Sequence, residues 1–453
     1  ALAVVVGILL GVLMGMNKFA NRFFMLTFTA IRQIPMIAWV PILIIWFGIG
    51  EESKVAVIFL AAYFPILVNT VSGIERTDPK LIEVGKMYHL NGWQQFTQIY
   101  LPSALPSIFV GLKLGLSVSW MAVVGAEMIA ATSGIGFRIN DARSLMQYPI
   151  VFAGISALDI ALWDIKGKYF NVPVYQLLGG KMRDKLRCYA SQLQFGWGER
   201  KTPAYQIEDY VANAKKAVSE GYDAIKIDFF TFDPKGYRYS SEETTRVLDP
   251  YHVHVVIDRL AAVREAVGPD VDIIMENHSY IDAQVAVQLG EQAKKYNILF
   301  FEEPTTPNPK MNKFVCDKLN IPIAQGERIY SRWGYAPYFD DGSIQLIQPD
   351  IGNCGGLTEA KKICDLAHIY DVGVQAHVCA SPLSTAVALQ LEAAIPNFTI
   401  HEHHVYNRYD YNKKLCKYDY QPVDGYIAVP DFPGIGNELT DYCFTNGKVT
   451  TIE

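Results

Sequence analysis

Residues 298–327 read ILFFEEPTTPNPKMNKFVCDKLNIPIAQGE, and this stretch decides the fold of the last two thirds of the chain. Two short apolar runs, residues 298–302 and 321–327, each end in a glutamate and flank a polar segment of helical length. Short apolar strands that alternate with helices are typical of parallel sheets. The stretch therefore predicts a strand, a helix and a second, parallel strand.

The same alternation continues in both directions from this stretch. Further strand candidates are residues 187–191, 222–229, 271–276, 344–350, 373–377 and 398–402. Eight strands with helices between them predict an α/β fold, a TIM-like (β/α)7β barrel, which we place at residues 185–403. The active sites of such barrels lie at the C-terminal ends of the strands.

A titratable side chain ends each of six successive predicted strands. The six are Glu276, Glu302, Glu327, Asp350, His377 and Glu402, spaced 23 to 27 residues apart. This spacing is the length of one strand and one helix, so the six side chains would converge on one mouth of the barrel. Helix capping explains a single carboxylate after a strand, but six groups in phase indicate an active site.

Three of these groups, Glu276, Glu302 and Glu327, predict a metal site. Three converging carboxylates cannot all stay ionised beside one another without a cation. Oxygen ligands with room for water suit Mg²⁺, and the lack of cysteine or histidine among the three argues against zinc. We therefore expect Mg²⁺ as the cofactor.

Two histidines are candidates for proton transfer. His377 and Asp350 end adjacent strands and fit a base that is oriented by a carboxylate. His278 follows Glu276 by two residues, so strand alternation places both on the same face. His278 is then a candidate proton donor to a leaving group, with a purely hydrogen-bonding role as the alternative.

Lys226 and Asp228 share a face of the second predicted strand by the same alternation. We expect them to reach the carboxylate end of a substrate. The alternative is a structural ion pair at the barrel rim.

Five strings in the second part carry a family resemblance. They are SALDIALWDIKGK (156–168), FFEEP (300–304), GER (326–328), QPDIGNCGGLTE (348–359) and HEHH (401–404). With them, residues 156–453 resemble the mandelate racemase and acid-sugar dehydratase branch of the enolase superfamily, of the galactonate or mannonate type.

The resemblance implies abstraction of the proton alpha to a carboxylate, and the dehydration of a small-molecule sugar acid to a 2-keto-3-deoxy acid. It implies Mg²⁺ on Glu276, Glu302 and Glu327, a His377–Asp350 base, a His278 acid, and a Glu402 hydrogen bond near the enediolate. Relatives of this kind are cytoplasmic homo-oligomers.

Two details refine this expectation. Racemases often show K-x-K after the second strand, whereas this chain has Lys226-Ile227-Asp228, which favours dehydration over racemisation. In the HEHH string, alternation puts His401 and His403 opposite Glu402, so we expect no separate metal site there.

The first third of the chain has a different composition. Residues 1–150 hold only 17 of the 86 charged side chains. Four stretches, residues 1–16, 34–50, 55–74 and 104–134, are apolar enough for a lipid bilayer. We therefore predict an all-α transmembrane segment within residues 1–134 and membrane localisation for this third, and the net charge of −6 does not favour a nucleic-acid partner.

Loop charges suggest an orientation for this segment. Residues 17–33 and 72–103 hold three Lys or Arg each, and the opposite side holds three in all. If each apolar run crosses the membrane once, this excess favours a cytoplasmic loop at residues 72–103.

That loop carries a second resemblance. Glu83-Val84-Gly85, followed by Ile99, Leu101 and Pro102, resembles the E-A-A…G…I-x-L-P loop of ABC-importer permeases of the sulfonate, taurine and nitrate type. The resemblance implies docking on an ABC ATPase subunit through Glu83, Gly85, Leu101 and Pro102. The motif differs in that Val84 and Gly85 replace two alanines and His89 stands at the glycine position. Gly85 weakens a helix by about 1 kcal/mol relative to alanine.

The two resemblances meet at about residue 154, so the chain reads as a chimera. We expect a permease-like fragment at residues 1–153, a remnant of a capping-domain helix and linker at 154–184, the barrel at 185–403, and a C-terminal segment at 404–453 that packs on a capping domain. Most of the capping domain and two permease helices are missing. The capping domain supplies the loops that close over the substrate, so its loss would impair catalysis.

Three hypotheses follow: an acid-sugar dehydratase impaired by the missing cap, a truncated importer permease, and a non-functional fusion of two truncated genes. Residues 149–163 include Asp159 and are too short to span a membrane. The side of the membrane on which the barrel lies is therefore open.

Overall fold

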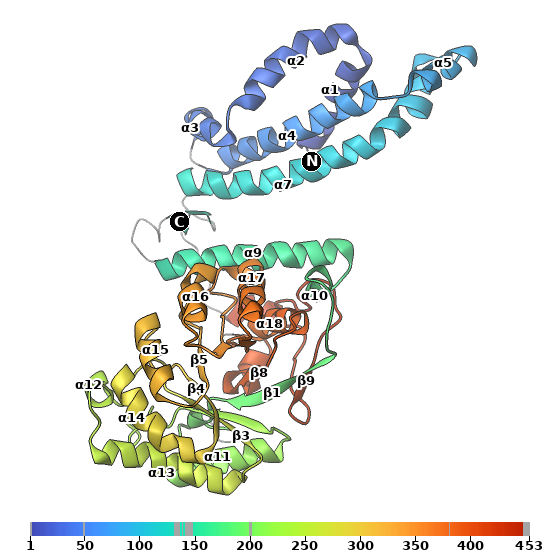
Figure 1. The fold of residues 1–453 in the computed structure, drawn as a ribbon. Coiled ribbons are helices and arrows are strands. Elements are labelled where there is room, and N and C mark those ends of the chain that lie inside the picture. Colours follow the sequence, from blue (N-terminus) through green and yellow to red (C-terminus); the bar gives the residue numbers. More distant parts are fainter. Residues whose placement is uncertain are drawn as a thin grey trace. The chain divides into compact units, whose positions relative to one another are not determined.

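A computed structural model describes residues 2–48, 50–130, 136–137, 139–140, 148–198, 202–379 and 381–446. The chain divides into two compact units, Ala1–Val151 and Phe152–Val449. The described residues of the first unit form helices, and the second unit contains the sheet (Figure 1). The change in architecture thus coincides with the change in composition.

The helices of the first unit follow one another with short connections. They are α1 (Leu2–Met16), α2 (Lys18–Gln33), α3 (Met36–Phe47), α4 (Glu51–Glu75), α5 (Pro79–Met87), α6 (Gly92–Gln95), the π-helical turn η1 (Phe96–Tyr100) and α7 (Leu101–Ala130).

Two of these helical segments, Glu52–Glu75 and the continuous Gly92–Glu127, are long and apolar enough to cross a membrane. A third crossing would need α2 together with residues 38–47, which form a pair bent by 104°. Residues 34–50 were predicted as a span, but α3 has only 12 residues, because it starts after Pro35 and stops at Gly48. α1 is apolar and shorter than a span.

A glycine face lets α1 lie against α4. Gly7, Gly11 and Gly15 recur every four residues, and a Cβ atom added at Gly11 would lie only 2.6 Å from the Cβ of Thr70. Small residues at this spacing allow the close backbone approach that is typical of membrane helices.

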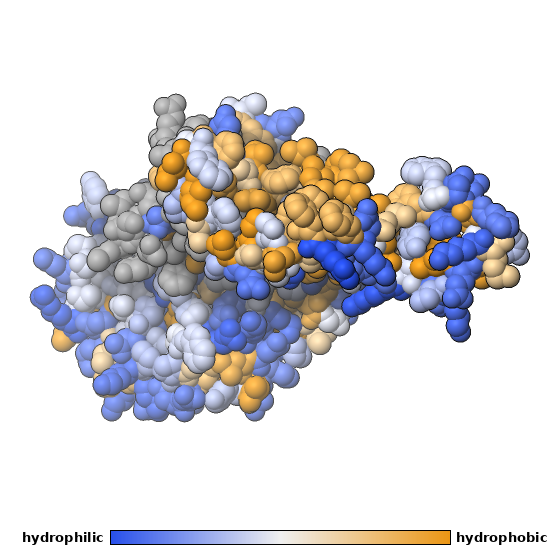
Figure 2. Space-filling view, turned by 90° about the horizontal axis from the view of Figure 1, so that it is seen from above, coloured by the Kyte–Doolittle hydropathy of each residue, from blue (hydrophilic) through white to orange (hydrophobic). Residues whose placement is uncertain are grey.

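Apolar side chains cover much of the surface of the helical unit, and polar ones gather at the end that carries α5 (Figure 2). Leu26, Ile45 and Leu116 are 79%, 81% and 75% exposed. Apolar patches of this extent mark interaction or membrane surfaces. The exposed apolar surface of this unit is therefore consistent with a membrane environment.

The second unit is built on a ring of eight parallel strands. They are β1 (Lys185–Ser191), β2 (Ala224–Ile227), β3 (Asp272–Glu276), β4 (Ile298–Glu302), β5 (Ile323–Gln325), β6 (Leu346–Ile347), β7 (Gly373–Val374) and β8 (His401–His404). Their order is β7-β6-β5-β4-β3-β2-β1-β8, and a parallel bridge between Val374 and Phe398 closes the ring. β9 (Tyr426–Ala428) pairs antiparallel with β1.

Seven helices connect consecutive strands. They are α11 (Ile207–Ser219), α13 (Pro250–Val267), α14 (Ala283–Ala293), α15 (Pro309–Lys318), α16 (Ser331–Asp340), α17 (Gly356–Ile369) and α18 (Pro382–Ala393). A short helix, α12 (Ser241–Thr244), precedes α13. The predicted (β/α)7β barrel is confirmed.

Alternation along the strands builds the barrel interior in layers. One buried cluster takes a single residue from each of β1 to β6 and one from just before β8: Tyr189, Ala224, Ile274, Phe300, Ala324, Leu346 and Ile400. Two residues further along the same inward face stand Lys226, Glu276, Glu302 and Glu402. The packed layer therefore forms a floor, and the next layer toward the C-terminal strand ends is charged.

Helix α9 (Tyr148–Phe170) is attached to the barrel through its second half. Asp159 accepts hydrogen bonds from the backbone nitrogen and hydroxyl of Thr358 at 2.9 and 2.6 Å, and Asp164 accepts one from the nitrogen of Ile435 at 2.9 Å. Trp163 donates to the Thr358 hydroxyl at 2.8 Å. The aspartates of the SALDIALWDIKGK string are therefore anchors for this helix.

Two of the six titratable residues predicted to end strands do so, and the other four do not. Glu276 and Glu302 are the last residues of β3 and β4, but Glu327, Asp350 and His377 follow β5, β6 and β7 by two or three residues. Glu402 lies inside β8 rather than at its end, because β8 pairs with β1 from His401 to His404.

Candidate functional site

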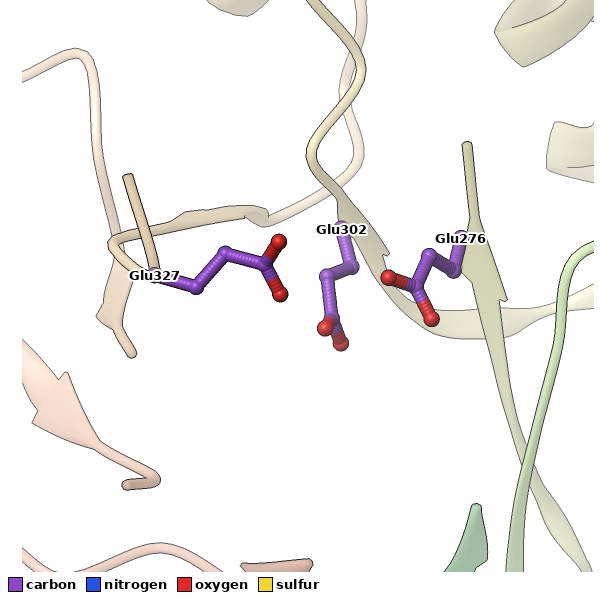
Figure 3. Close-up of side chains that lie close together, drawn as sticks. All are labelled: Glu276, Glu302 and Glu327. Carbon is purple, nitrogen blue, oxygen red and sulfur yellow. The ribbon is translucent and has the colours of Figure 1, made fainter. Parts of the chain in front are cut away.

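Three carboxylates from three consecutive strand units point toward one another at the mouth of the barrel (Figure 3). One oxygen from each of Glu276, Glu302 and Glu327 lies within 4.8 Å of the other two. Glu276 and Glu302 are buried, and Glu327 is 13% exposed. The three residues that the sequence proposed as metal ligands are thus brought together.

Unpartnered oxygens in this cluster fit a cation. Glu302 Oε2 is buried and makes no hydrogen bond to any described residue, and Glu276 Oε1 is buried 3.2 Å from His278 Nε2 without a hydrogen bond of good geometry. Burial raises the pKa of Glu302 to about 8, against the lowering effect of Lys226. A buried acceptor without a donor costs about 1–3 kcal/mol or more, and a hard cation bound by all three carboxylates would remove that cost.

Lys226 lies beneath the cluster and is fully buried. Its ammonium is 3.2 Å from Glu276 Oε2, 2.5 Å from Glu302 Oε1 and 2.9 Å from Glu402 Oε1. Burial lowers the pKa of Lys226, but the three carboxylates outweigh it and raise this pKa well above its ordinary value. Carboxylates of the protein thus surround the ammonium, and its contact with a substrate carboxylate stays a prediction.

Glu402 is held from several sides. Oε1 accepts from the Ser191 hydroxyl at 2.6 Å, and Oε2 accepts from the backbone nitrogen of Val378 at 2.8 Å. Burial raises the pKa of Glu402, but Lys226 and His377 outweigh this effect and keep that pKa well below its ordinary value. Glu402 is therefore a fixed carboxylate within reach of the Lys226 ammonium.

His278 stands directly beside the cluster. Its Nδ1 is 2.8 Å from Asp228 Oδ2, and its Nε2 is 3.2 Å from Glu276 Oε1. Burial lowers the pKa of His278, but Glu276 and Asp228 outweigh it and raise this pKa to about 9. Asp228 thus orients the imidazole, so that its other nitrogen faces the carboxylates.

His377 repeats this arrangement at the end of β7. Its Nδ1 is 2.8 Å from Asp350 Oδ2, and its Nε2 is 3.0 Å from Glu327 Oε2. Burial lowers the pKa of His377, while Glu327 and Asp350 together raise it well above its ordinary value. Two histidines, each fixed at Nδ1 by an aspartate, therefore direct Nε2 at the carboxylate cluster from β3 and from β7.

Comparison with known families decides the kinship of this barrel. Residues 209–443, more than half of the chain, match the family described as enolase C-terminal domain-like. The chain belongs to the enolase superfamily. In this superfamily, sites use a lysine or histidine base with one or two Mg²⁺ ions.

Known relatives of this enolase-superfamily chain act on acid sugars. A D-galactonate dehydratase of Pectobacterium atrosepticum is 31% identical over 317 residues, which cover 67% of this chain and 78% of the relative. A D-xylonate dehydratase of Haloferax volcanii is 33% identical over 291 residues, 64% of this chain and 68% of the relative. The prediction of an enzyme of the hydro-lyase class, related to acid-sugar dehydratases, is confirmed.

A solved structure of an enolase-superfamily member from Salmonella Typhimurium is 51% identical to this chain, with a TM-score of 0.65. The match covers 67% of this chain and 78% of that one. Residues 3–163 match a second family, the binding-protein-dependent transport system inner membrane component. The predicted combination of a permease-like segment with an enolase-superfamily barrel is confirmed.

The enolase-superfamily site includes polar residues that the sequence did not single out. Gln192, just after β1, donates to Glu276 Oε2 at 2.6 Å and receives a hydrogen bond from Gln194, whose oxygen accepts from the Asp228 nitrogen at 3.3 Å. Gln192 has a left-handed backbone, with φ of 68°. The available signal was an amide side chain at the end of β1, but glutamine does not titrate and so does not belong to the series of titratable strand ends.

The histidines that flank Glu402 face away from the cluster. His401 Nδ1 lies 2.5 Å from Glu392 Oε2, and His403 Nδ1 lies 2.7 Å from the Tyr222 hydroxyl. Both rings are buried. The structure therefore gives each an internal hydrogen-bonding partner, on the opposite face from Glu402.

In the permease-like unit, Glu83 and Gly85 lie on α5, while Leu101 and Pro102 begin α7. Glu83 is exposed, whereas Gly85 is buried and a Cβ added there would lie 2.4 Å from Ile99 Cδ1. His89, at the position of the family glycine, has a left-handed backbone with φ of 52°. Gly85 and His89 thus both lie where the local geometry favours glycine.

Proposed function

We propose that the barrel dehydrates an acid sugar, with Mg²⁺ bound by Glu276, Glu302 and Glu327. The observation that carries this proposal is the pair of aspartate-oriented histidines that face one carboxylate cluster. When bound, the metal would supply positive charge where negative charge develops on the substrate carboxylate. An aldonate such as D-galactonate fits the known relatives.

In this proposal, the two histidines have opposite tasks. Mg²⁺ on Glu327 would offset the charge that raises the pKa of His377 and so would favour the neutral ring. The neutral His377 Nε2 would then take the proton from the carbon next to the carboxylate, while Asp350 keeps the ring's own proton on Nδ1. The electron pair left behind forms a carbon–carbon double bond as the hydroxyl on the next carbon departs. His278 Nε2 gives that hydroxyl a proton, so that water leaves.

Lys226 and Glu402 position this machinery. The Lys226 ammonium holds Glu276 and Glu302 in place and offsets part of their repulsion. Glu402 accepts from the backbone nitrogen of Val378, next to the base, and as an ionised carboxylate it could accept a hydrogen bond from a substrate hydroxyl near the enediolate. The loops that would close over the substrate come from the capping domain in relatives, so we expect slower turnover here.

The test is deuterium exchange at the alpha carbon of D-galactonate, followed by NMR in D2O with and without Mg²⁺. The full chain should exchange the proton only with Mg²⁺, and His377→Asn should lose at least about 100-fold, as expected for a general base. The melting temperature of the His377→Asn variant should still rise with Mg²⁺, whereas that of Glu302→Gln should not. Exchange that is equal in wild type and His377→Asn would contradict the proposal.

We propose a second function for residues 1–153, as a permease fragment that docks an ABC ATPase through α5 and the start of α7. The match to the transport-system family favours it. Co-purification of an ATPase that is lost on Glu83→Lys would support it. If neither this interaction nor Mg²⁺-dependent exchange is found, the results favour the third hypothesis, a non-functional fusion of two truncated genes.

A further inference from the structure

Helix α2 has a basic side that neither proposed function uses. Its sequence is KFANRFFMLTFTAIRQ, with three basic residues and no Asp or Glu. Lys18 and Arg22 are four residues apart, and Arg32 is fourteen residues after Lys18. At 3.6 residues per turn, the three side chains fall within about a quarter turn of the helix, and we call them the basic stripe.

A second stripe of α2 is apolar and exposed. Phe19, Phe23 and Leu26 follow one another at intervals of four and three residues and are 79%, 66% and 79% exposed. The Phe19 and Phe23 rings stack, with their centroids 6.5 Å apart. This apolar stripe lies next to the basic stripe around the helix, because Phe19 directly follows Lys18 and Phe23 directly follows Arg22.

The remaining face of α2 packs against its own unit, at whose outer edge the helix lies (Figure 1). Phe24, Phe28 and Ile31 contact a buried cluster of α1 and α4 that includes Met14 and Tyr63. The Phe28 and Tyr63 rings meet edge to face, with their centroids 6.0 Å apart. The basic and apolar stripes therefore point away from this packed core.

The charges of the basic stripe are available to a partner. Lys18, Arg22 and Arg32 are exposed, and none of them forms an ion pair with a residue that the structure describes. Basic side chains beside an exposed apolar stripe are typical of a helix that lies in the headgroup region of a membrane. An acidic protein surface would complement the charges alone, whereas a bilayer of anionic lipid complements both stripes.

The start of α2 lies beside the end of α4. The side chain of Asn21 donates a hydrogen bond at 2.5 Å to that of Glu75, the last residue of α4, and the exposed Arg76 follows directly. Loop charges predict a cytoplasmic location for residues 72–103. We therefore expect α2 at the cytoplasmic leaflet, whose surface carries anionic lipid.

The alternative, one bent span made of α2 and residues 38–47, is unfavourable. The two parts are bent by 104°. Arg32 lies near the middle of residues 18–47, so a single span would bring its charge close to the bilayer centre, where an ionised side chain is costly. α2 alone has 16 residues, fewer than the about 20 that a span needs.

We propose that α2 lies in the plane of the membrane interface and binds anionic phospholipids. The apolar stripe inserts among the outer segments of the acyl chains, and the basic stripe contacts the lipid phosphates. Guanidinium and ammonium groups bind phosphate by charge-assisted hydrogen bonds. The helix thus attaches the unit to one leaflet without crossing the membrane.

The lipid preference of the full chain tests the basic stripe. In vesicles of phosphatidylcholine, electron paramagnetic resonance compares the protein-bound fractions of spin-labelled phosphatidylglycerol and spin-labelled phosphatidylcholine. We expect phosphatidylglycerol to be preferred by at least about threefold, and the variant Lys18→Gln/Arg22→Gln to lower this preference by at least about twofold. The matched control Lys80→Gln/Lys86→Gln removes two exposed charges from α5 and should keep the wild-type preference.

The accessibility of the two helix ends tests the in-plane orientation. Lys18→Cys and Gln33→Cys are each treated with a membrane-impermeant maleimide in inside-out and in right-side-out vesicles, and mass spectrometry identifies the labelled peptide. A helix in the interface should be labelled at both positions from the same side of the membrane. A bent span would instead place residue 33 inside the bilayer, where the reagent does not reach.

Equal lipid preference in wild type and Lys18→Gln/Arg22→Gln would overturn the proposal. Protection of Gln33→Cys from the reagent, or labelling of the two positions from opposite sides, would also overturn it. A basic stripe that binds an acidic protein instead would show no preference between the two lipids. Flotation of the vesicles tests membrane insertion separately, and no measurement uses Mg²⁺, a sugar acid or an ATPase, so failure here is separate from failure of either proposed function.

Discussion

Lys226 illustrates how single residues set the electrostatics of the barrel mouth. It is a buried cation in contact with Glu276, Glu302 and Glu402, which all lie on the inward face of their strands. A buried charge is tolerated only when it is paired and hydrogen-bonded. The lysine and the carboxylates therefore depend on each other, and neither can be removed alone without cost.

Lys226→Met should destabilise the metal-free barrel by about 3–5 kcal/mol, because removal of one partner leaves buried charges unpaired. Mg²⁺ should recover part of this loss, since under the proposed function it would bind two of the same carboxylates. Chemical denaturation with and without Mg²⁺ measures both effects. Lys215→Met, on the exposed face of α11, is the matched control and should change stability by less than about 0.5 kcal/mol.

Helix α9 is held in place because one of its own side chains caps another helix, α17. The Asp159 carboxylate accepts from the backbone nitrogen of Thr358, in the first turn of α17. It therefore acts as a cap and as a negative charge at a helix N-terminus. Gly356, in the same turn, has φ of 85°, and a Cβ there would lie 2.5 Å from an Asp159 carboxylate oxygen.

Asp159→Ala should lower the free energy of unfolding by about 1–2 kcal/mol, the usual cost of a lost cap. Gly356→Ala should also destabilise the barrel unit, because its left-handed backbone and the nearby Asp159 both oppose a side chain. Denaturant melts followed by Trp163 fluorescence check both variants. A stability equal to wild type in both would contradict this account of how α9 is anchored.

A second element contact links the end of α11 to the turn that follows β8. The Glu220 carboxylate accepts from Arg408 Nη2 and from Trp197 Nε1, both at 3.0 Å. Burial raises the pKa of Glu220, but Arg408 outweighs it and holds this pKa below the ordinary value of 4.5. Because the folded pKa is depressed, the contribution to stability is present above the unfolded pKa and is lost as pH falls through the folded one.

Glu220→Gln should therefore cost about 1–2 kcal/mol at pH 7, and less as the pH falls below 4.5. Urea titrations of wild type and variant at pH 7, 5 and 3.5 give this difference directly. Glu242→Gln, on exposed α12, should show no such trend. A cost that stays constant over this pH range would mean that the charge of Glu220 is not involved.

At the scale of the whole molecule, a membrane-type unit and a soluble-type barrel occur in one chain. Exposed apolar side chains are concentrated on α1 to α7, and two helical segments there have spanning length. We expect the full chain to stay in the membrane pellet after washes in 1 M salt and alkaline carbonate, and to be released by detergent. Release by salt alone would show peripheral attachment and contradict a spanning segment.

The join between the two units has its own test. A tryptic or chymotryptic peptide that spans residues 147–164 of the native protein should be detected by mass spectrometry along with peptides from both sides. Abundant flanking peptides without a spanning one would indicate two separate proteins. This measurement separates a genuine membrane-tethered enzyme from an artefactual fusion.

The sequence by itself determined the barrel and the approach of Glu276, Glu302 and Glu327, because strand alternation and a repeat of about 25 residues place side chains without knowledge of long-range contacts. It also separated the two units, since charge density follows the surrounding solvent. Only the tertiary structure decided that Lys226 lies among carboxylates, that Gln192 joins the site, and that the helix of the second apolar stretch is limited to Met36–Phe47. These features depend on contacts between residues far apart in the chain, or on a local backbone turn, and periodicity contains no information about either.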